Sequence, residues 1–573
     1  MTPMGHRIES GRASWVRRCV VRRAIAAAVA AGAFAAATVA FPGQQPRTVR
    51  RALQRAAPNW SNDWSRGSVF YEVFVRSYAD SDGDGNGDLK GLLGKLDYLN
   101  TGDPGTTSDL KVDAICLMPV FRSPSYDGYD ATDYETVNLA YGSNDDFATL
   151  CREAHRRGIK VVLDFPVNQT SAAHPWFVEA SSSAAAAHRR WYVWSPVDLG
   201  WRQPWAPRSG GATWHQNLKD GQWFYGASSA EMPDLNFANP DVRAEIKRLA
   251  SLWLERGADG FRLGAARGLV ENGDGLLQVD QPETHEFWRE LSWAVRTARR
   301  DATLVGEVRA DTPVIATYYG RTAAVPGGDE FPITLDFPLA AAVIQGVGSQ
   351  RATAIANKLA EVRGAYPAGA ADAPLLTDHD QVRLATQLAG DPARIRNAAA
   401  ILLTLPGAPF LYYGEEVGLA NGAPEGDVRA RRTPMPWDPS PGGGFTRGAP
   451  WFPFSPGRET ANVASETADP SSLLTRYRSL IRARRSSAAL RTGDLQLLAS
   501  GSSQVLAFLR TSPDEGVLVV HNLSGAPQVA VTPAHCASEP ETLFADPGAS
   551  IVAEGGSCRV TLPPRGSAAW RLK

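Results

Sequence analysis

The 573-residue sequence carries almost no net charge. Lys and Arg together number 59 and Asp and Glu together number 60, so the formal net charge is −1 at pH 7. A chain that binds nucleic acid or an anionic membrane surface normally has a clear basic excess. We therefore expect no nucleic-acid partner.

Long hydrophobic runs are absent except near the N-terminus. There, an alanine-rich run at 24–41 follows four closely spaced arginines and precedes Pro42. This pattern predicts a signal peptide over residues 1–41, cleaved after Ala40, and export to the periplasm or the extracellular space. An uncleaved signal anchor is the alternative, although the run is only marginally long enough to span a bilayer. Residues 42–60 read as a linker, and no later segment looks transmembrane.

Cysteine is also scarce, with five residues in the whole chain. Cys19 lies in the leader. Cys536 and Cys558 lie close together near the C-terminus, and an exported protein meets an oxidising compartment, so we expect them to form a disulfide. Cys116 and Cys151 fall in a strand-like run and a helix-like run, and we expect both to be buried thiols.

From about residue 66, strand-like runs alternate with amphipathic helices. This alternation predicts parallel βαβ units, and their number favours an eight-stranded (β/α)8 TIM barrel. A doubly wound sheet is the alternative, but the chain lacks a glycine-rich phosphate loop. The predicted strands are 68–78, 112–120, 159–167, 260–263, 302–308, 373–380 and 408–416, and the clearest helices are 89–99, 144–158 and 242–257.

Two segments depart from the alternation and divide the chain. Residues 169–236 are rich in Trp, Gly and Ser and are too long for an ordinary loop, which predicts an inserted domain. Residues 483–573 contain short alternating strands, which predict a C-terminal antiparallel β-sandwich. The barrel then comprises 61–168 and 237–482. Sixteen Trp and fifteen Tyr suit flat, ring-shaped ligands such as sugars, although such residues also fill cores.

Polar residues stand where the predicted strands end, which is where barrel enzymes carry their reactive groups. Among them, Glu307 and Asp380 offer the paired carboxyl groups that acid chemistry on an acetal requires. A retaining glycosidase needs a further nucleophilic carboxylate on the opposite face of the sugar from the acid. The strand-end residues are Asp164, Asn168, Gly264, Glu307, His379, Asp380 and Glu415.

From about Trp60 to the C-terminus, the chain resembles the α-amylase family, glycoside hydrolase family 13. The motifs that carry the resemblance are "YEVFVRSYADSDGDGNGDLKG", "SPSYDGYDATDY", "VVLDFPVNQT", "MPDLNF", "GFRLGAARGL", "LVGEV", "LLTDHDQVR", "GAPFLYYGEEVGL" and "RRTPMPWD". They are similar to the secreted amylase, oligo-glucosidase and neopullulanase side of the family. The resemblance implies a barrel, an inserted B domain and a C-terminal sandwich. It also implies that the ligand is an α-glucan or maltooligosaccharide.

The resemblance assigns roles to strand-end residues. It implies that Glu307 is the general acid/base and that Asp380 stabilises the transition state. Arg262 would orient the nucleophile, and Asp164 would be a structural aspartate.

Other residues would bind the sugar in subsite −1. Tyr129 would stack under its ring, and His379 would hold its hydroxyls. Asp130 and Arg383 would act as a pair on its far hydroxyls.

Four positions around the same subsite depart from the family pattern. Gly264 stands where the family has its nucleophilic aspartate, and Gln169 and Asp127 each replace a histidine. Asp378 replaces an asparagine. Because glycine cannot form a glycosyl ester, we expect an inactive or strongly impaired homologue that still recognises α-glucans.

Three alternatives remain open at this point. Asp127 or Asp378 could act as the base for direct attack by water, or Asp127 could serve as a displaced nucleophile. The chain could also be a scaffold or protein-interaction module that binds no sugar, and any protein partner is unknown. Either acid could supply the counter-charge that Arg262 has lost.

The run "DSDGDGNGD" places carboxylates at alternate positions of a glycine-rich loop. Hard oxygen ligands at this spacing suit Ca²⁺, although the twelfth position is not the glutamate of an EF-hand. The resemblance implies a structural calcium site here, with a backbone carbonyl as one ligand. The candidate residues are Asp80, Asp82, Asp84, Asn86 and Asp88.

Overall fold

The computed structural model describes residues 63–572 except 207–209, 323–324, 326, 425 and 537–538. The predicted signal peptide at 1–41 and the linker at 42–60 lie outside the described residues. No helix in the described part combines the length and the apolar character needed to cross a membrane.

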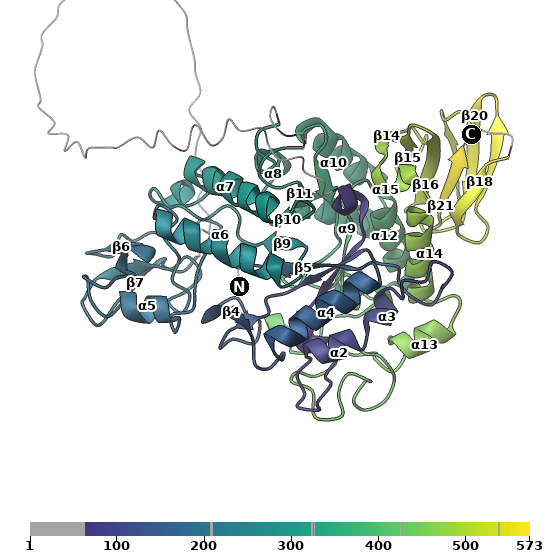
Figure 1. The fold of residues 1–573 in the computed structure, drawn as a ribbon. Coiled ribbons are helices and arrows are strands. Elements are labelled where there is room, and N and C mark those ends of the chain that lie inside the picture. The colour runs from purple at the N-terminus through teal and green to yellow at the C-terminus, as the bar shows by residue number, and fades with distance from the viewer. Residues whose placement is uncertain are drawn as a thin grey trace, which may run out of the picture. The chain divides into compact units, whose positions relative to one another are not determined.

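Eight parallel strands form the centre of the fold, in the order β12-β11-β10-β9-β5-β2-β1-β13 (Figure 1). The sheet closes on itself, because a parallel bridge joins Leu375, just after β12, to Phe410 in β13. This closure confirms the predicted barrel and excludes the doubly wound alternative. The strands are β1 (Phe70–Val73), β2 (Ala114–Leu117), β5 (Lys160–Asp164), β9 (Gly260–Leu263), β10 (Thr303–Gly306), β11 (Ile333–Leu335), β12 (Ala371–Ala373) and β13 (Phe410–Tyr412).

The barrel interior is filled by one buried side chain after another along the strands, and small residues are frequent among them. Cys116 belongs to this interior cluster and is buried, as predicted, and Cys151 is buried on α4. The cluster comprises Phe70, Ala114, Cys116, Val162, Val305, Ile333, Leu335, Ala340, Ala371, Ala373, Leu375, Ala408 and Phe410.

Helices surround the barrel and turn the chain back between strands. The helix predicted over 89–99 is interrupted: α2 ends at Gly94 and a new turn starts after Lys95. The predicted helix at 144–158 is α4, which begins with a capping box made by Ser143 and Asp146. The helices are α2 (Leu89–Leu93), α3 (Leu96–Leu99), α4 (Asn144–Arg156), α6 (Pro240–Glu255), α7 (Pro282–Ala298), α8 (Thr312–Thr317), α9 (Phe337–Ser349), α10 (Ala352–Ala365), α11 (Leu384–Gln387) and α12 (Pro392–Thr404).

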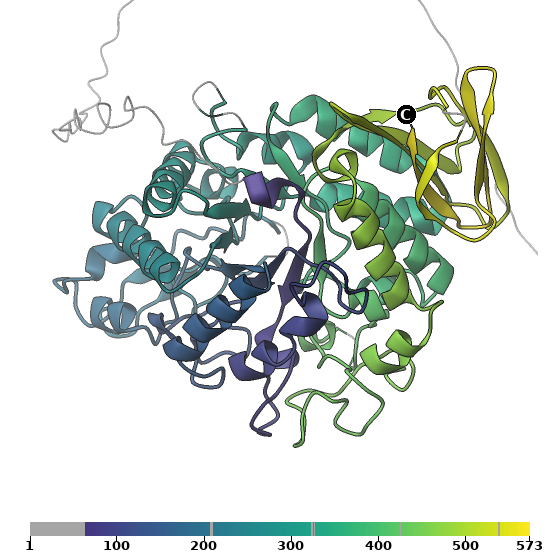
Figure 2. The same cartoon turned by 45° about the vertical axis from the view of Figure 1, so that its right-hand side comes forward.

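The long connection between β5 and α6 folds into a small unit of its own. It contains α5 (Pro175–Ala180) and a three-stranded antiparallel sheet of β6 (Trp194–Ser195), β8 (Trp223–Tyr225) and β7 (Trp214–Gln216). Its end returns to the barrel, where the Leu235 amide donates to the Asn168 carbonyl. The insert and the C-terminal sheets lie on opposite sides of the barrel (Figures 1 and 2).

After the barrel, three helices lead into two antiparallel sheets, which confirms the predicted C-terminal β domain. The helices are α13 (Val463–Ala468), α14 (Leu473–Arg485) and α15 (Ala488–Thr492). One sheet has the order β14-β15-β16-β21-β18 and the other β17-β20-β19. Their strands are β14 (Asp494–Leu497), β15 (Val505–Ser512), β16 (Glu515–Asn522), β17 (Gln528–Thr532), β18 (Glu541–Ala545), β19 (Ser550–Glu554), β20 (Ser557–Leu562) and β21 (Ser567–Leu572).

The two cysteines of this domain are free thiols in the structure, contrary to the predicted disulfide. Both are buried, and the Cys558 thiol donates to the Ala534 carbonyl at 3.5 Å. Burial, and then the neighbouring Cys536 thiol, raise the pKa of Cys558 to about 12. The sequence correctly predicted that Cys536 and Cys558 lie close together, but the predicted disulfide between them is absent from the described structure.

Candidate active site

A buried guanidinium stands at the centre of the polar strand ends. Arg262, at the end of β9, is 1% exposed. Its Nη1 donates to Asp164 at 2.9 Å and to Glu72 at 3.0 Å. Its Nη2 donates to Glu307 at 2.7 Å and lies 3.4 Å from Asp378. The sequence pattern anticipated most of these residues, but not Glu72, which lies near the middle of its predicted strand.

The contacts of Arg262 show which of the two candidate acids, Asp378 or Asp127, lies beside its guanidinium. Asp378 is one of the carboxylates beside Arg262, as one hypothesis predicts, but its 3.4 Å distance to Nη2 is the longest among the four acidic partners. Asp127 does not, because its carboxylate lies 2.9 Å from Arg432 instead. The shortest contact is with Glu307, the residue expected to be the general acid.

A second arginine, Arg309, holds the other oxygen of Glu307. Arg309 Nε donates to Glu307 Oε1 at 2.6 Å, and Arg309 Nη2 donates to Asp378 at 2.7 Å. Burial would raise the pKa of Glu307, but Arg262 and Arg309 hold it below its ordinary value. A general acid must be protonated to donate to a leaving oxygen, so this arrangement opposes that role. Sequence reasoning missed Arg309, although its place two residues after Glu307 was a usable signal.

A third arginine, Arg432, joins the two remaining acids of the cleft. Its Nη1 donates to Asp127 at 2.9 Å and its Nη2 to Asp380 at 2.8 Å. Burial would raise the pKa of Asp380, but His379, Arg309 and Arg432 lower it. Asp127 is therefore a counter-ion of Arg432 rather than a displaced nucleophile. Arg432 lies in the motif "RRTPMPWD", which carried the family resemblance, but the sequence did not show that its side chain points toward Asp127 and Asp380.

The backbone around Gly264 is firmly held although the residue has no side chain. A Cβ added there would meet one atom within 4 Å, Glu307 Oε2 at 3.5 Å, which is ordinary van der Waals contact. The Asn168 amide donates to the Ala265 carbonyl at 3.0 Å and to the Gly268 carbonyl at 2.6 Å. Ala265 has a φ of +47°, a left-handed conformation that is unusual for alanine. The strand end is thus held in place, and a Cβ at position 264 would fit without a clash.

An aromatic platform lies beside this strand end. The Tyr129 hydroxyl donates to Asp164 at 2.8 Å and lies 2.8 Å from His379 Nε2, and the two rings stack with centroids 5.6 Å apart. The side-chain amide of Gln169 donates to the Tyr129 carbonyl at 3.1 Å. Burial would lower the pKa of His379, but Asp380 and Glu72 raise it. Tyr129, its Gln169 contact and the His379 ring thus form one hydrogen-bonded aromatic cluster at the strand ends.

Asp130 and Arg383 are expected to act as a pair on the far hydroxyls of the sugar, and that role stays a prediction; in the described part of the chain no hydrogen bond or ion pair joins the two. Asp130 accepts hydrogen bonds from the hydroxyls of Ser123 and Ser125. Arg383 is buried, donates to the Tyr413 carbonyl at 2.8 Å and lies over the rings of Tyr412 and Tyr413. Arg383 is the N-cap residue of α11, but its side chain makes no capping hydrogen bond and is buried instead.

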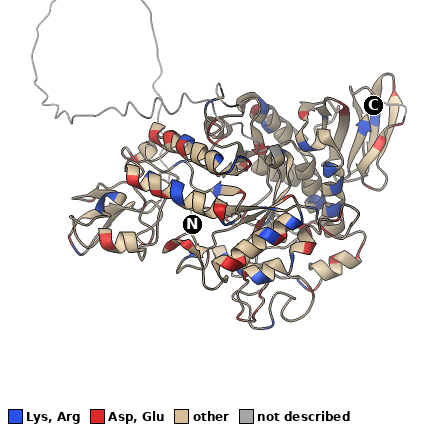
Figure 3. Cartoon of the chain, viewed as in Figure 1, with Lys and Arg blue, Asp and Glu red and all other residues tan. Residues whose placement is uncertain are grey.

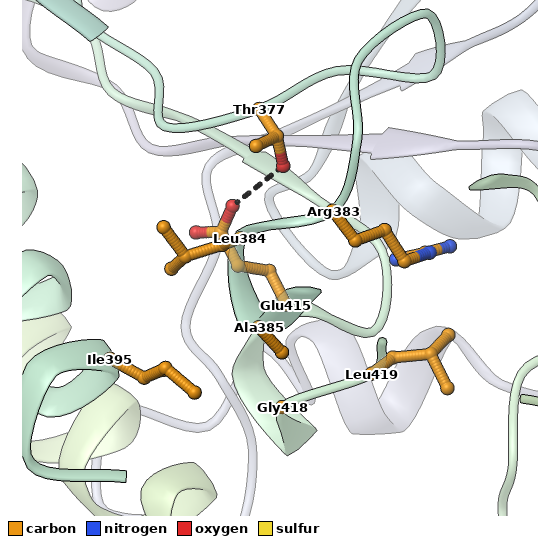
Figure 4. Close-up of a pocket in the computed structure, with 8 residues that line it drawn as sticks. All are labelled: Thr377, Arg383, Leu384, Ala385, Ile395, Glu415, Gly418 and Leu419. Atoms are coloured by element: carbon orange, nitrogen blue, oxygen red, sulfur yellow. Dashed lines mark hydrogen bonds between the residues drawn. The ribbon is translucent and has the colours of Figure 1, made fainter. Parts of the chain in front are cut away.

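Glu415, the last of the strand-end acids, also faces away from the cleft. Its carboxylate accepts from the Tyr477 hydroxyl at 2.8 Å and from the Thr377 hydroxyl at 3.4 Å, while the Arg383 guanidinium points elsewhere (Figure 4). Burial raises the pKa of Glu415 to about 8. This residue serves the packing of α14 against the barrel.

Replacement of Glu415 by Gln should therefore change how stability depends on pH. The raised pKa means that the folded state holds the Glu415 proton up to about pH 8, whereas an unfolded glutamate with an ordinary pKa near 4.5 loses it earlier. The stabilisation is present below the unfolded pKa and is lost as the pH rises through 8. In urea unfolding, Glu415→Gln should lose less stability between pH 5 and pH 8 than the natural chain. An unchanged slope would contradict this assignment.

The acidic loop after β1 brings three of its five candidate ligands together. Carboxylate oxygens of Asp80, Asp82 and Asp88 lie within 4.8 Å of one another. Asp84 instead accepts a hydrogen bond from the backbone N–H of Asn86 at 2.7 Å. The Asn86 side-chain oxygen accepts from Arg76. A cluster of hard carboxylate oxygens fits Ca²⁺.

The same loop is tied to a distant part of the chain. The Asp80 amide donates to the Phe445 carbonyl at 2.8 Å, and Asp80 accepts from the Thr446 hydroxyl. A cation held by the loop would therefore fasten the segment around 446 to the barrel.

Comparison with known proteins agrees with this architecture. Residues 72–493 match the family model "Alpha amylase, catalytic domain", and residues 495–568 match "Maltogenic Amylase, C-terminal domain". Alpha-amylase 3 of Dictyoglomus thermophilum is 36% identical over 441 residues, covering 76% of this chain and 80% of the relative. An oligo-1,6-glucosidase of Parageobacillus thermoglucosidasius is 30% identical over 510 residues, covering 78% and 88%.

A solved structure shows the same fold. The crystal structure of an α-amylase from H. orenii is 35% identical, with a TM-score of 0.79 over 88% of this chain and 99% of that one. The family match covers the barrel that carries Arg262 and Glu307, and it extends over nearly three quarters of the chain. The chain therefore belongs to the α-amylase family, glycoside hydrolase family 13.

Proposed function

We propose that this protein recognises α-glucans in a family cleft whose hydrolytic chemistry is strongly impaired. The observation that carries the proposal is the state of Glu307, which is bound on both oxygens by Arg262 and Arg309 beside an open position at Gly264. Relatives bear the names alpha-amylase and oligo-1,6-glucosidase, which supports α-glucans as the ligand class. Tyr129 and His379 retain the surface on which a sugar would lie.

The chemistry lost is the covalent half of a retaining mechanism. A glycine offers no oxygen to carbon 1 of the sugar, so no glycosyl ester forms. By analogy with other removed nucleophiles, the rate should fall by about 10⁴- to 10⁶-fold. Water could enter the space above Gly264, but the two acids that could activate it, Asp127 and Asp378, are each bound by an arginine. We therefore propose binding with little or no turnover.

The binding half of the proposal is tested with two variants of one residue. Maltoheptaose titrated into the natural protein should give saturable heat in calorimetry. Tyr129→Phe keeps the ring and should retain most of the affinity, whereas Tyr129→Ala should bind at least about tenfold more weakly because the stacking surface is gone. If the natural protein binds no maltooligosaccharide, the scaffold alternative replaces the proposal.

We further propose that the loop around Asp80 binds Ca²⁺ as a structural ion, held by Asp80, Asp82 and Asp88. Calcium at a hundredfold excess over its Kd should stabilise the fold by about 2.7 kcal/mol. Thermal unfolding should shift downward on addition of a chelator and recover with Ca²⁺. Asp82→Asn should reduce that shift, while Asp97→Asn, an exposed acid outside the loop, should not. Identical melting with and without the chelator would refute the site.

The leader supports a proposal about location. We propose that the protein is exported after cleavage near Ala40. Expression of the full chain in a bacterial host, with mass measurement of the exported product, would detect a mature N-terminus close to residue 41. Retention of the intact chain in the membrane fraction would instead indicate the signal anchor.

A further inference from the structure

A second cavity lies at the opposite end of the barrel from the candidate active site. Its volume is about 560 Å³, and its walls come from the segments that lead into β2 and β5 and from the end of α14. None of its ten lining residues in the described chain is acidic, and five are cationic. The cationic residues are Lys111, Arg156, Arg157, Arg482 and Arg485.

Lys111 shows that this cavity is a built feature rather than a loose surface. It is 6% exposed, and its ammonium group lies 3.2 Å from the fully buried carboxylate of Asp109. Its backbone adopts a φ of +60°, the left-handed conformation that costs a side-chain-bearing residue energy. The surrounding fold therefore holds the backbone of Lys111 in a left-handed conformation and its buried side chain against Asp109 at the cavity wall.

Arg482 is a cation without a carboxylate partner. In the described part of the chain it donates to the Thr107 carbonyl at 3.1 Å and to the Ser479 hydroxyl at 3.5 Å, and no acid lies within ion-pair distance. Burial, and then the nearby Arg478, lower the pKa of Arg482. Figure 3 shows Lys and Arg gathered along α14, where both residues lie.

The other three arginines are each paired with an acid that does not line the cavity, and Arg485 is paired with Asp113. Arg156 binds Glu153 through Nε and Nη2, which leaves its Nη1 without a protein acceptor in the described structure. Arg157 donates from Nε to Asp97 and from Nη1 to Glu153, so its Nη2 has no protein acceptor in the described structure. Several N–H donors thus remain for a ligand.

We propose that this cavity binds a phosphate group, either as the free anion or as part of a small phosphate ester. Guanidinium groups present parallel N–H donors that match phosphate oxygens, and several of them converge here with no acid among the lining residues. The volume lies within the range of small-molecule sites, so the cavity has room for a sugar attached to the phosphate. This inference is independent of the proposed glucan cleft.

The test is calorimetric titration with inorganic phosphate and, separately, with glucose 6-phosphate, at ionic strength balanced with sodium chloride. The natural protein should bind at least one of them saturably. Arg156→Ala and Arg482→Ala should each weaken binding about tenfold, the effect of losing one hydrogen bond to a charged group. Arg152→Ala is the matched control, because Arg152 is exposed on the same helix as Arg156 but does not line the cavity.

The comparison of the two probes and of the variants decides between the outcomes. Tighter binding of glucose 6-phosphate identifies an ester as the ligand, and equal binding identifies the free anion. Arg482→Lys, which keeps the charge, should lose less affinity than Arg482→Ala if both variants fold by circular dichroism. The proposal is overturned if neither probe binds saturably, or if Arg309→Ala in the glucan cleft weakens binding while Arg156→Ala and Arg482→Ala do not.

Discussion

The Gly264→Asp variant should gain hydrolysis of maltooligosaccharides relative to the natural chain. The new carboxylate would stand on the ordered end of β9, where the added Cβ contacts Glu307 Oε2 at an unstrained 3.5 Å. It would also face the Nη2 of Arg262, which now binds Glu307. The glycosyl ester then becomes possible, and release of Glu307 from Arg262 lets its pKa rise.

The recovery should be partial. We expect a gain of about 10²- to 10³-fold, well short of the 10⁴- to 10⁶-fold that a covalent nucleophile contributes. Arg309 would still hold Glu307 ionised, and Arg432 would still join Asp127 to Asp380. Adding Arg309→Ala to Gly264→Asp should raise the rate further, because the general acid is then freed from both cations.

The matched control is Gly264→Asn, which has the same shape but cannot form the ester. Release of reducing sugar should be no greater for Gly264→Asn than for the natural chain. Equal gains from the two substitutions, or no gain from Gly264→Asp in a folded protein, would contradict the assignment of position 264.

Arg262→Met should produce the largest loss of stability among single changes in the cleft. The substitution leaves Glu72, Asp164 and Glu307 without the cation that they share in the buried interior. Removing one partner of a buried ion pair typically costs 3–5 kcal/mol, about the amount we expect here. Urea unfolding followed by tryptophan fluorescence at pH 7 would measure it.

The loss should depend on pH in a defined direction. Burial would raise the pKa of Glu72 and Glu307, but Arg262, the next cause for each, lowers both below their ordinary 4.5. Their contribution is therefore present above about pH 4.5 and is lost as the pH falls through the lowered values. The difference in unfolding free energy between Arg262→Met and the natural chain should therefore become smaller as the pH falls below about 4.5.

The control for Arg262→Met is Arg248→Met. Arg248 pairs with Glu135 and Glu245 on the surface, and its side chain is 48% exposed. Exposed pairs of this kind contribute about 0–1 kcal/mol. If the two substitutions cost the same, Arg262 is not the electrostatic centre of the site.

The sequence predicted the fold correctly where helices and strands are long enough to show a clear hydrophobic period. Alternation of strands and helices predicted the barrel, and the run of aromatic and small residues after β5 predicted an insert. The three-residue strand β11 escaped notice because Ile333–Leu335 is too short to show a period. The strand predicted over 373–380 was displaced, because β12 spans Ala371–Ala373 and only an isolated bridge at Leu375 follows it in the sheet.

The site was harder to predict than the fold, because a motif fixes a position in the chain but not the direction of a side chain. Asp130 and Arg383 occupy motif positions, yet one binds serines and the other enters the core. Contacts across long separations were also invisible, as between Arg432 and Asp127, which lie 305 residues apart. The sequence shows directly that position 264 is a glycine. Only the structure shows that Arg262 and Arg309 both bind the Glu307 carboxylate.

The most direct test of the central claim is a comparison of turnover between the natural chain and Glu307→Gln. Both proteins would be assayed at saturating maltoheptaose, after calorimetry has shown that each binds it. We predict equal release of reducing sugar at the background level, because in the proposed function Glu307 performs no proton transfer without a nucleophile at position 264. Turnover by the natural chain well above that of Glu307→Gln would contradict the account and show that the cleft is a working hydrolase.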